Sequence, residues 1–212
     1  MLAAGALSTD LRVKGYMAVA ITCAENKDIV GVNAAVNKMR LATGSKRGRD
    51  VSDFGLKMMI LNITAALIDN GQLREAGRLL STLEEQTDDV SFKMGIEPGL
   101  QLQRVLILAL ADQFGAARSL AMKMQPDSIT DVARGRALRI TALLQTKQSG
   151  ISHSLPWSRT LVDIQDRTHA LLGIFQALLE IEEVKLGLHR NPGPLSCVLV
   201  RSQVVRRQGN CV

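Results

Sequence analysis

The chain has 212 residues, of which 46% are hydrophobic and only 3% aromatic, and it contains five prolines. This length allows one sizeable core or a row of small ones, and the composition favours helix over sheet. Four of the 26 basic residues and no acidic residue lie in 188–212, so 22 basic residues face 20 acidic ones elsewhere, a net charge of +2. A body this close to neutral argues against general binding of nucleic acid.

The cysteines and the apolar runs limit where the chain can function. Cys23, Cys197 and Cys211 are odd in number and widely spaced, which fits neither a disulfide framework nor a zinc site. We therefore predict a cytoplasmic protein without metal or cofactor. In addition, no apolar run approaches the ~20 residues of a membrane span. One alternative concerns the N-terminus, where Lys14 and the apolar stretch up to Cys23 could act as a secretion signal ending at a lipidated cysteine.

Apolar residues recur at helical spacing along most of the chain, and turn residues divide this pattern into pairs. We predict helices near 9–25, 29–42, 52–69, 72–86, 98–111, 114–124, 128–147 and 166–186, and a short one beginning near Trp157. Residues 43–50 are predicted to form the loop after the first pair. Residues 148–156, QSGISHSLP, are predicted to form another loop.

The stretch from Leu67 to Leu83 shows how such a pair is built. Asp69-Asn70-Gly71 has turn chemistry, because Asn and Gly tolerate positive φ and Gly71 can end a helix in the left-handed conformation. The residues after the turn place an apolar stripe on one helical face: Leu73, Ala76, Leu79, Leu80 and Leu83. An amphipathic pair cannot bury this face alone, so it needs a neighbour.

The pair recurs when the sequence is shifted by 41 residues. The shift aligns small residues in one column, Ala35, Ala76, Ala117 and Ser158, and identical leucines in another, Leu79, Leu120 and Leu161, with Lys38 as the exception. This recurrence predicts an all-α fold in which antiparallel helix pairs stack as a short right-handed α-solenoid of about 8–10 helices. The helical-repeat domain would span 1–188, followed by a basic, extended or disordered tail at 189–212.

The second helices carry a residue pattern known from one repeat family. Ala76, Leu80 and Leu83 place a small residue and then large apolar residues four and seven positions on. In this, residues 25–125 resemble the tetratricopeptide repeats in a degenerate form, or another helical repeat, without the aromatic residues of the family's first helix. The resemblance implies a scaffold or adaptor that binds a protein partner through a groove, without catalysis.

The sequence offers little catalytic chemistry. It has no phosphate-binding glycine loop, dinucleotide fingerprint, zinc-protease motif or nucleophile elbow. Charged residues do gather at the start of the last helix, in Asp163, Asp166 and Arg167, and one unit earlier, in Asp131, Arg134 and Arg136. We interpret them as surface pairs and helix-dipole partners, or as the charged rim of a groove.

We therefore predict a non-enzymatic protein that binds a peptide or helix in a groove. The candidate partner-binding residues lie on first helices and in the basic loop: Lys57, Asn62, Gln103, Arg104, Lys46, Arg47 and Arg49. One alternative is a nucleic-acid-associated protein that uses the basic loop and the tail. Another is an all-α bundle with a ligand-binding or enzymatic pocket lined by His169, Asp163, Asp166 and Arg167.

Overall fold

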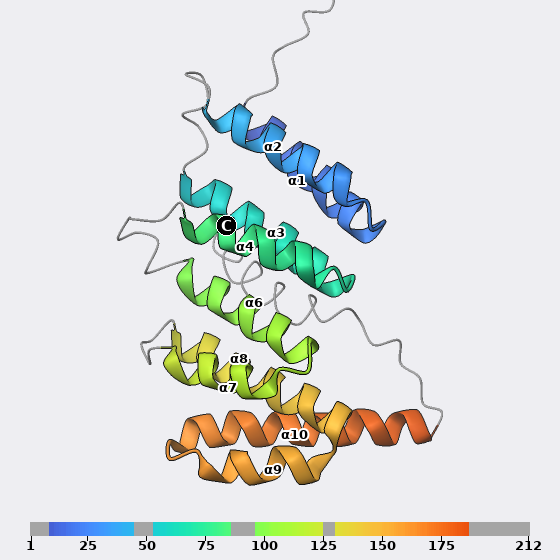
Figure 1. Cartoon of the computed structure of the whole chain (residues 1–212), viewed down its shortest axis with the longest axis vertical. Coiled ribbons are helices and arrows are strands. Elements are labelled where there is room, and N and C mark those ends of the chain that lie inside the picture. The colour runs from blue at the N-terminus through green and yellow to red at the C-terminus, as the bar shows by residue number, and fades with distance from the viewer. Residues whose placement is uncertain (1–8, 45–52, 86–95, 125–129, 187–212) are drawn as a thin grey trace, which may run out of the picture. The chain divides into compact units, whose positions relative to one another are not determined.

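The computed structural model describes residues 9–44, 53–85, 96–124 and 130–186. These residues form nine α-helices and no strand, which confirms the predicted all-α class (Figure 1). None of the described helices combines the length and the apolar character that a membrane span requires. The chain divides into two compact units after Phe92, and the predicted domain boundary near residue 188 lies outside the described residues.

The first unit contains two helix pairs, drawn in blue to green in Figure 1. The first pair is α1 (Thr9–Glu25) and α2 (Ile29–Gly44), and the second is α3 (Asp53–Asp69) and α4 (Leu73–Glu85). Each helix packs on its pair partner, and α3 also packs on α1 and, less extensively, on α2. The buried side chains are almost all aliphatic, as expected for a core built from leucine-rich and alanine-rich helices.

Polar contacts also join the two pairs of the first unit. The side chain of Gln72, between α3 and α4, donates a hydrogen bond of 2.6 Å to the carbonyl oxygen of Ala24 near the end of α1. Arg78 on α4 donates to Asn33 on α2 and forms an ion pair of 2.5 Å with Glu75. Side chains of the second pair therefore hold the first pair at both its turn and its second helix.

The second unit contains five helices, drawn in yellow-green to orange in Figure 1. They are α6 (Glu97–Leu110), α7 (Phe114–Lys123), α8 (Thr130–Ser149), α9 (Ile151–Thr160) and α10 (Ile164–Lys185). The central helix is α8, because it contacts each of the other four. Its most extensive contact is with α10.

Glycines allow α8 and α10 to approach closely. A Cβ atom placed on Gly173 of α10 would overlap the carbonyl oxygen of Arg139 on α8 and lie 3.1 Å from the Cβ of Ala142. One helical turn earlier, a Cβ atom placed on Gly135 of α8 would lie 2.5 Å from the imidazole ring of His169. At Gly173 the backbones of the two helices can therefore approach this closely only because the residue lacks a side chain.

The same turn joins the helices of the first three pairs. A residue with positive φ follows each first helix, namely Lys27 (59°), Gly71 (74°) and Asp112 (59°). Each of these donates its N–H to the carbonyl three positions back, at 3.0 to 3.2 Å, and the next residue donates to the carbonyl five positions back, at 2.8 to 2.9 Å. These two bonds form a Schellman motif, and the residue that completes it also begins the second helix.

The turns correct the repeat length derived from the sequence. Gly71 and Asp112 are 41 positions apart, as the sequence shift requires, but Lys27 and Gly71 are 44 apart. The next turn, at Gly150, has a different conformation, with φ of 85° and ψ of 165°. The small residues aligned by the shift are nevertheless all at most 3% exposed: Ala35, Ala76, Ala117 and Ser158.

Because the first two turns are 44 and not 41 residues apart, different residues occupy equivalent positions in the first two helix pairs. By turn geometry Ala76 corresponds to Val32 rather than to Ala35, since each is the fourth residue of its helix. A shift of three residues is nearly one helical turn, so Val32 and Ala35 lie on the same buried face. Leu79 then corresponds to the buried Ala35 instead of the exposed Lys38, so the first pair also has an apolar residue at this position, although not a leucine.

The loop predicted at 148–156 is wrong, because residues from Ile151 onward form α9. Pro156 lies inside this helix, on its exposed side, where water can reach the carbonyl left without an N–H donor. Burial of Ser154 and Trp157 on the opposite side stabilises the helix in spite of the proline. The serine hydroxyl also accepts a hydrogen bond of 2.7 Å from Thr146 of α8.

Candidate functional site

The second unit contains a surface pocket of about 770 Å³ beside the start of α10. Its wall combines side chains from α7, α8 and α9 with the turn that leads into α10. The lining residues are Arg118, Met122, Arg134, Trp157, Thr160, Leu161, Val162, Asp163, Ile164, Gln165 and Asp166. We refer to this site as the α9–α10 pocket, and its surface is mainly apolar with four charged residues.

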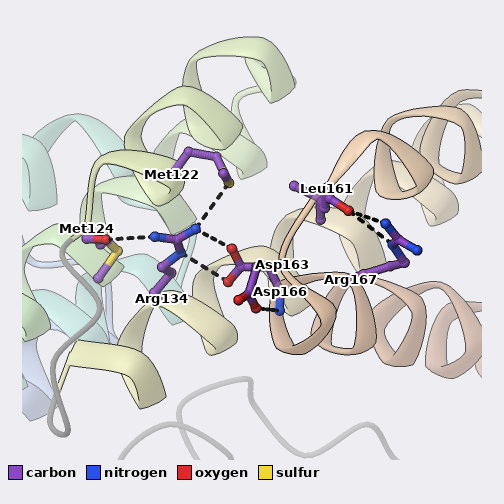
Figure 2. Close-up of polar contacts among 7 residues, drawn as sticks. All are labelled: Met122, Met124, Arg134, Leu161, Asp163, Asp166 and Arg167. Atoms are coloured by element: carbon purple, nitrogen blue, oxygen red, sulfur yellow. Dashed lines mark hydrogen bonds and ion pairs between the residues drawn. The ribbon is translucent and has the colours of Figure 1, made fainter.

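A buried ion pair forms one side of the pocket (Figure 2). Arg134 of α8 donates from Nε to one carboxylate oxygen of Asp166 at 3.0 Å and from Nη2 to the other. The Asp166 side chain is 9% exposed and that of Arg134 is 14% exposed. Arg134 also donates to the carbonyl oxygen of Met124, at 3.3 Å, so this fork joins α7, α8 and α10. The charges of Arg134 and Asp166 therefore already neutralise each other within the second unit.

The turn before α10 is held by its own polar contacts, also drawn in Figure 2. The carboxylate of Asp163 accepts a hydrogen bond of 3.0 Å from the backbone N–H of Asp166, which caps the helix. Arg167 donates from Nε and Nη2 to the carbonyl oxygen of Leu161, at 3.0 and 2.6 Å. These contacts fix the pocket wall and leave Asp163 and Arg167 with structural roles.

Elsewhere in the pocket lining, an arginine lies over the indole ring of the chain's single tryptophan. The guanidinium carbon of Arg118 lies 4.7 Å from the ring centroid of Trp157, in cation–π geometry. Gln145 of α8 accepts from both residues, at 2.7 Å from Arg118 Nη2 and 2.7 Å from Trp157 Nε1. The Arg118–Trp157–Gln145 cluster is therefore held by α7, α8 and α9 together.

Arg118 has a charge that the second unit leaves uncompensated. Its Nε is buried without a hydrogen-bond partner, and no described residue forms an ion pair with it. Burial lowers the pKa of the guanidinium from its ordinary value, although arginine stays protonated at neutral pH. A partly buried cation beside an aromatic face is suited to binding a carboxylate that arrives with apolar side chains.

None of the predicted partner-binding residues that the structure describes belongs to the lining of this pocket. Lys57 on α3 is only 5% exposed, so little of its side chain is accessible. Asn62 on α3 is half-buried in the first unit, and Gln103 and Arg104 on α6 are half-buried in the second. The basic loop residues Lys46, Arg47 and Arg49, like the tail, lie outside the described residues.

The residues predicted to line a pocket in a helical bundle are only partly brought together. Asp163 and Asp166 do line the α9–α10 pocket, whereas His169 packs on Gly135 and Arg167 faces the turn. Within the described ranges, no group of three or more His, Cys, Asp and Glu side chains is placed to hold a metal ion.

The Arg118–Trp157–Gln145 cluster was not predicted from the sequence. The one available signal was the position of Arg118 next to Ala117, a member of the small column that the repeat aligns. Nothing in the sequence connects Arg118 with Gln145, 27 positions away, or with Trp157, because the packing of α7, α8 and α9 creates this contact.

The chain was also compared with known proteins. No protein-family model matches it, and no curated protein or solved structure matches it either. The resemblance of residues 25–125 to tetratricopeptide repeats stays a prediction.

Proposed function

We propose that this chain is a non-enzymatic helical-repeat protein that binds a protein partner, with the α9–α10 pocket as a contact site. The observation that carries the proposal is Arg118, a half-buried cation without an ion-pair partner among the described residues, held against Trp157 in a mainly apolar pocket. A partner segment that offers one carboxylate between apolar side chains complements this surface. Met122 and Leu161 provide the apolar contacts beside the cation.

The arrangement of helices supports a repeat protein of the α-solenoid type. In such a protein, each helix pair packs on its neighbours along the chain. In the first unit α3 packs on α1, and in the second α8 packs on α6 and α10 packs on α8. The Schellman turns at Lys27, Gly71 and Asp112 reverse the chain in the same way, which favours antiparallel pairing. We infer that the pairs within each unit stack as in a solenoid, the architecture predicted from sequence.

The chemistry of the pocket favours binding over catalysis. Asp166 is neutralised by Arg134, and Asp163 caps α10, so each carboxylate already has a structural partner. Removing either partner of the buried pair would leave a costly uncompensated charge, which is a reason to keep the pair intact. Arg118 is the polar group of the pocket that is best suited to an external ligand.

The proposal is tested with peptides displayed on phage and selected against the full-length chain. We expect enriched peptides to carry an acidic residue flanked by apolar ones. Replacing Arg118 by Gln should weaken their binding roughly 10-fold to 100-fold, since a hydrogen bond to a charged group contributes about 1.5–3 kcal/mol. The matched control is Arg139→Gln, because Arg139 is an exposed arginine of α8 that contacts Gln176 and lies outside the pocket lining.

Two results would contradict the proposal. One is the absence of any enriched acidic and apolar motif while circular dichroism shows that the immobilised chain is folded. The other is an enriched peptide whose affinity is unchanged by Arg118→Gln. A steep loss of affinity with rising salt, shared by both arginine variants, would instead indicate general electrostatic binding of the kind expected for nucleic acid.

A further inference from the structure

The last described helix, α10, is apolar on two opposite faces. One face packs against α8 and is formed by small and aliphatic residues, including Ala170, Gly173, Ile174 and Ala177. The other face carries five large apolar side chains that are each 40% to 59% exposed: Leu171, Leu172, Phe175, Leu178 and Leu179. We call these five residues the outer stripe of α10. A helix that is apolar all round is normally covered on both sides, so this stripe needs an occupant.

The outer stripe is symmetric about its central residue. Leu171 and Leu172 lie four and three positions before Phe175, and Leu178 and Leu179 lie three and four positions after it. If two copies of α10 pack antiparallel, with a two-fold axis passing at Phe175, the first leucine pair of one copy meets the second leucine pair of the other. The outer stripe is therefore self-complementary when two copies of α10 pair antiparallel, as an isologous interface requires.

The charges beyond the stripe favour the same arrangement. Arg167 lies eight positions before Phe175, and Glu182 and Glu183 lie seven and eight positions after it. All three side chains are exposed, and two of them also have partners within their own copy: Arg167 donates to the carbonyl oxygen of Leu161, and Glu182 pairs with Lys185 at 3.3 Å. An antiparallel pair places Arg167 of one copy at the level of the glutamates of the other copy, at both ends. A parallel pair would instead place Arg167 against Arg167 and glutamate against glutamate, which is unfavourable.

We propose that the outer stripe of α10 is a homodimer interface, in which two copies of the chain pack α10 against α10 antiparallel about a two-fold axis at Phe175. The occupant of the stripe is therefore a second copy of this chain. A single helix pair buries less than a standard interface of roughly 1,600 Å², so we expect a dissociation constant on the order of 1–100 μM. Phe175 would be the most deeply buried residue of the dimer, because it meets its own copy at the axis.

Sedimentation equilibrium of the full-length chain, over concentrations that bracket this range, tests the proposal. We expect a monomer–dimer equilibrium that Phe175→Glu weakens by roughly 100-fold or more, since it removes two large apolar side chains and introduces two facing charges. The matched control is Val132→Glu on α8, which changes a residue of similar exposure, 51% against 59%, outside the stripe. This control should dimerise like the unchanged chain.

A charge exchange tests the antiparallel register. Arg167→Glu and Glu182→Arg should each weaken the homodimer, roughly threefold to tenfold, because each places like charges together at both ends. An equimolar mixture of the two variants should regain dimerisation, since the mixed dimer restores opposite charges at both ends. Recovery in the mixture cannot arise from damage to the fold of either variant.

Three results would overturn the proposal. The first is a chain that stays monomeric throughout the concentration range, which would assign the stripe to the chain's own C-terminal segment or to another protein. The second is a dimer that Phe175→Glu does not weaken. The third is a mixture of charge variants that dimerises no better than either variant alone. Peptide binding at the α9–α10 pocket should be unaffected by Phe175→Glu, so this proposal and the proposed function can fail separately.

Discussion

The close approach of α8 and α10 leads to a prediction for Gly173→Ala. The new methyl group would overlap the carbonyl oxygen of Arg139 and would lie 2.9 Å from its carbonyl carbon and 3.1 Å from the Cβ of Ala142. A backbone carbonyl cannot rotate away, so the two helices must separate. Overpacking costs about 1–3 kcal/mol, and alanine regains up to about 1 kcal/mol over glycine in a helix. Because the contact is to backbone, we expect a net loss of about 2 kcal/mol in the free energy of unfolding.

Urea denaturation followed by far-ultraviolet circular dichroism measures this loss. The matched control is Gly115→Ala, a helical glycine of α7 in the same unit, where an added Cβ meets nothing within 4 Å. The control should be as stable as the unchanged chain or up to about 1 kcal/mol more stable. If Gly173→Ala has an unchanged midpoint and an unchanged denaturant slope, the inferred close packing of α8 on α10 is wrong.

Three further predictions concern the turns and the ion pairs. Lys27→Gly should stabilise the first unit by about 1 kcal/mol in thermal or urea unfolding, and Gly71→Ala should destabilise it by a similar amount, because both positions have positive φ. If both variants were as stable as the unchanged chain, the turn assignment would be contradicted. Arg134→Met should lower the free energy of unfolding by about 3 kcal/mol, because it leaves Asp166 charged and buried, and adding Asp166→Leu should restore more than half of that loss. A double variant no more stable than the single one would refute the pairing. The hydrogen bond from Arg78 lowers the pKa of Glu75 in the folded chain below its value in the unfolded chain. The stability that this interaction contributes is therefore complete above the unfolded pKa of Glu75 and is lost as the pH falls through its folded pKa. Glu75→Gln should therefore be less stable than the unchanged chain at neutral pH and equally stable in acid, and a difference that does not change with pH would count against the interaction.

The local features of the sequence determined most of the helices and the turns between them. Apolar spacing of three and four residues identified the helices, and Asp69-Asn70-Gly71 identified one Schellman turn, because these signals act within a few residues. The equivalent turns at Lys27 and Asp112 lack glycine, so their positive φ is recognisable only in the structure. Burial of the second-helix column at Ala35 and Ala117 also followed from the sequence pattern.

Only the tertiary structure determined which distant groups meet. A three-residue difference in repeat length leaves the same helical face buried, so apolar periodicity could not distinguish an interval of 44 from one of 41. The packing of α9 on α8 keeps Pro156 within a helix, against its local preference. Asp166 pairs with Arg134, 32 positions away, instead of with the neighbouring Arg167, because the close contact of α8 and α10 brings these charges together. Local periodicity determines which face of a helix is apolar, and the packing of whole helices determines what that face meets.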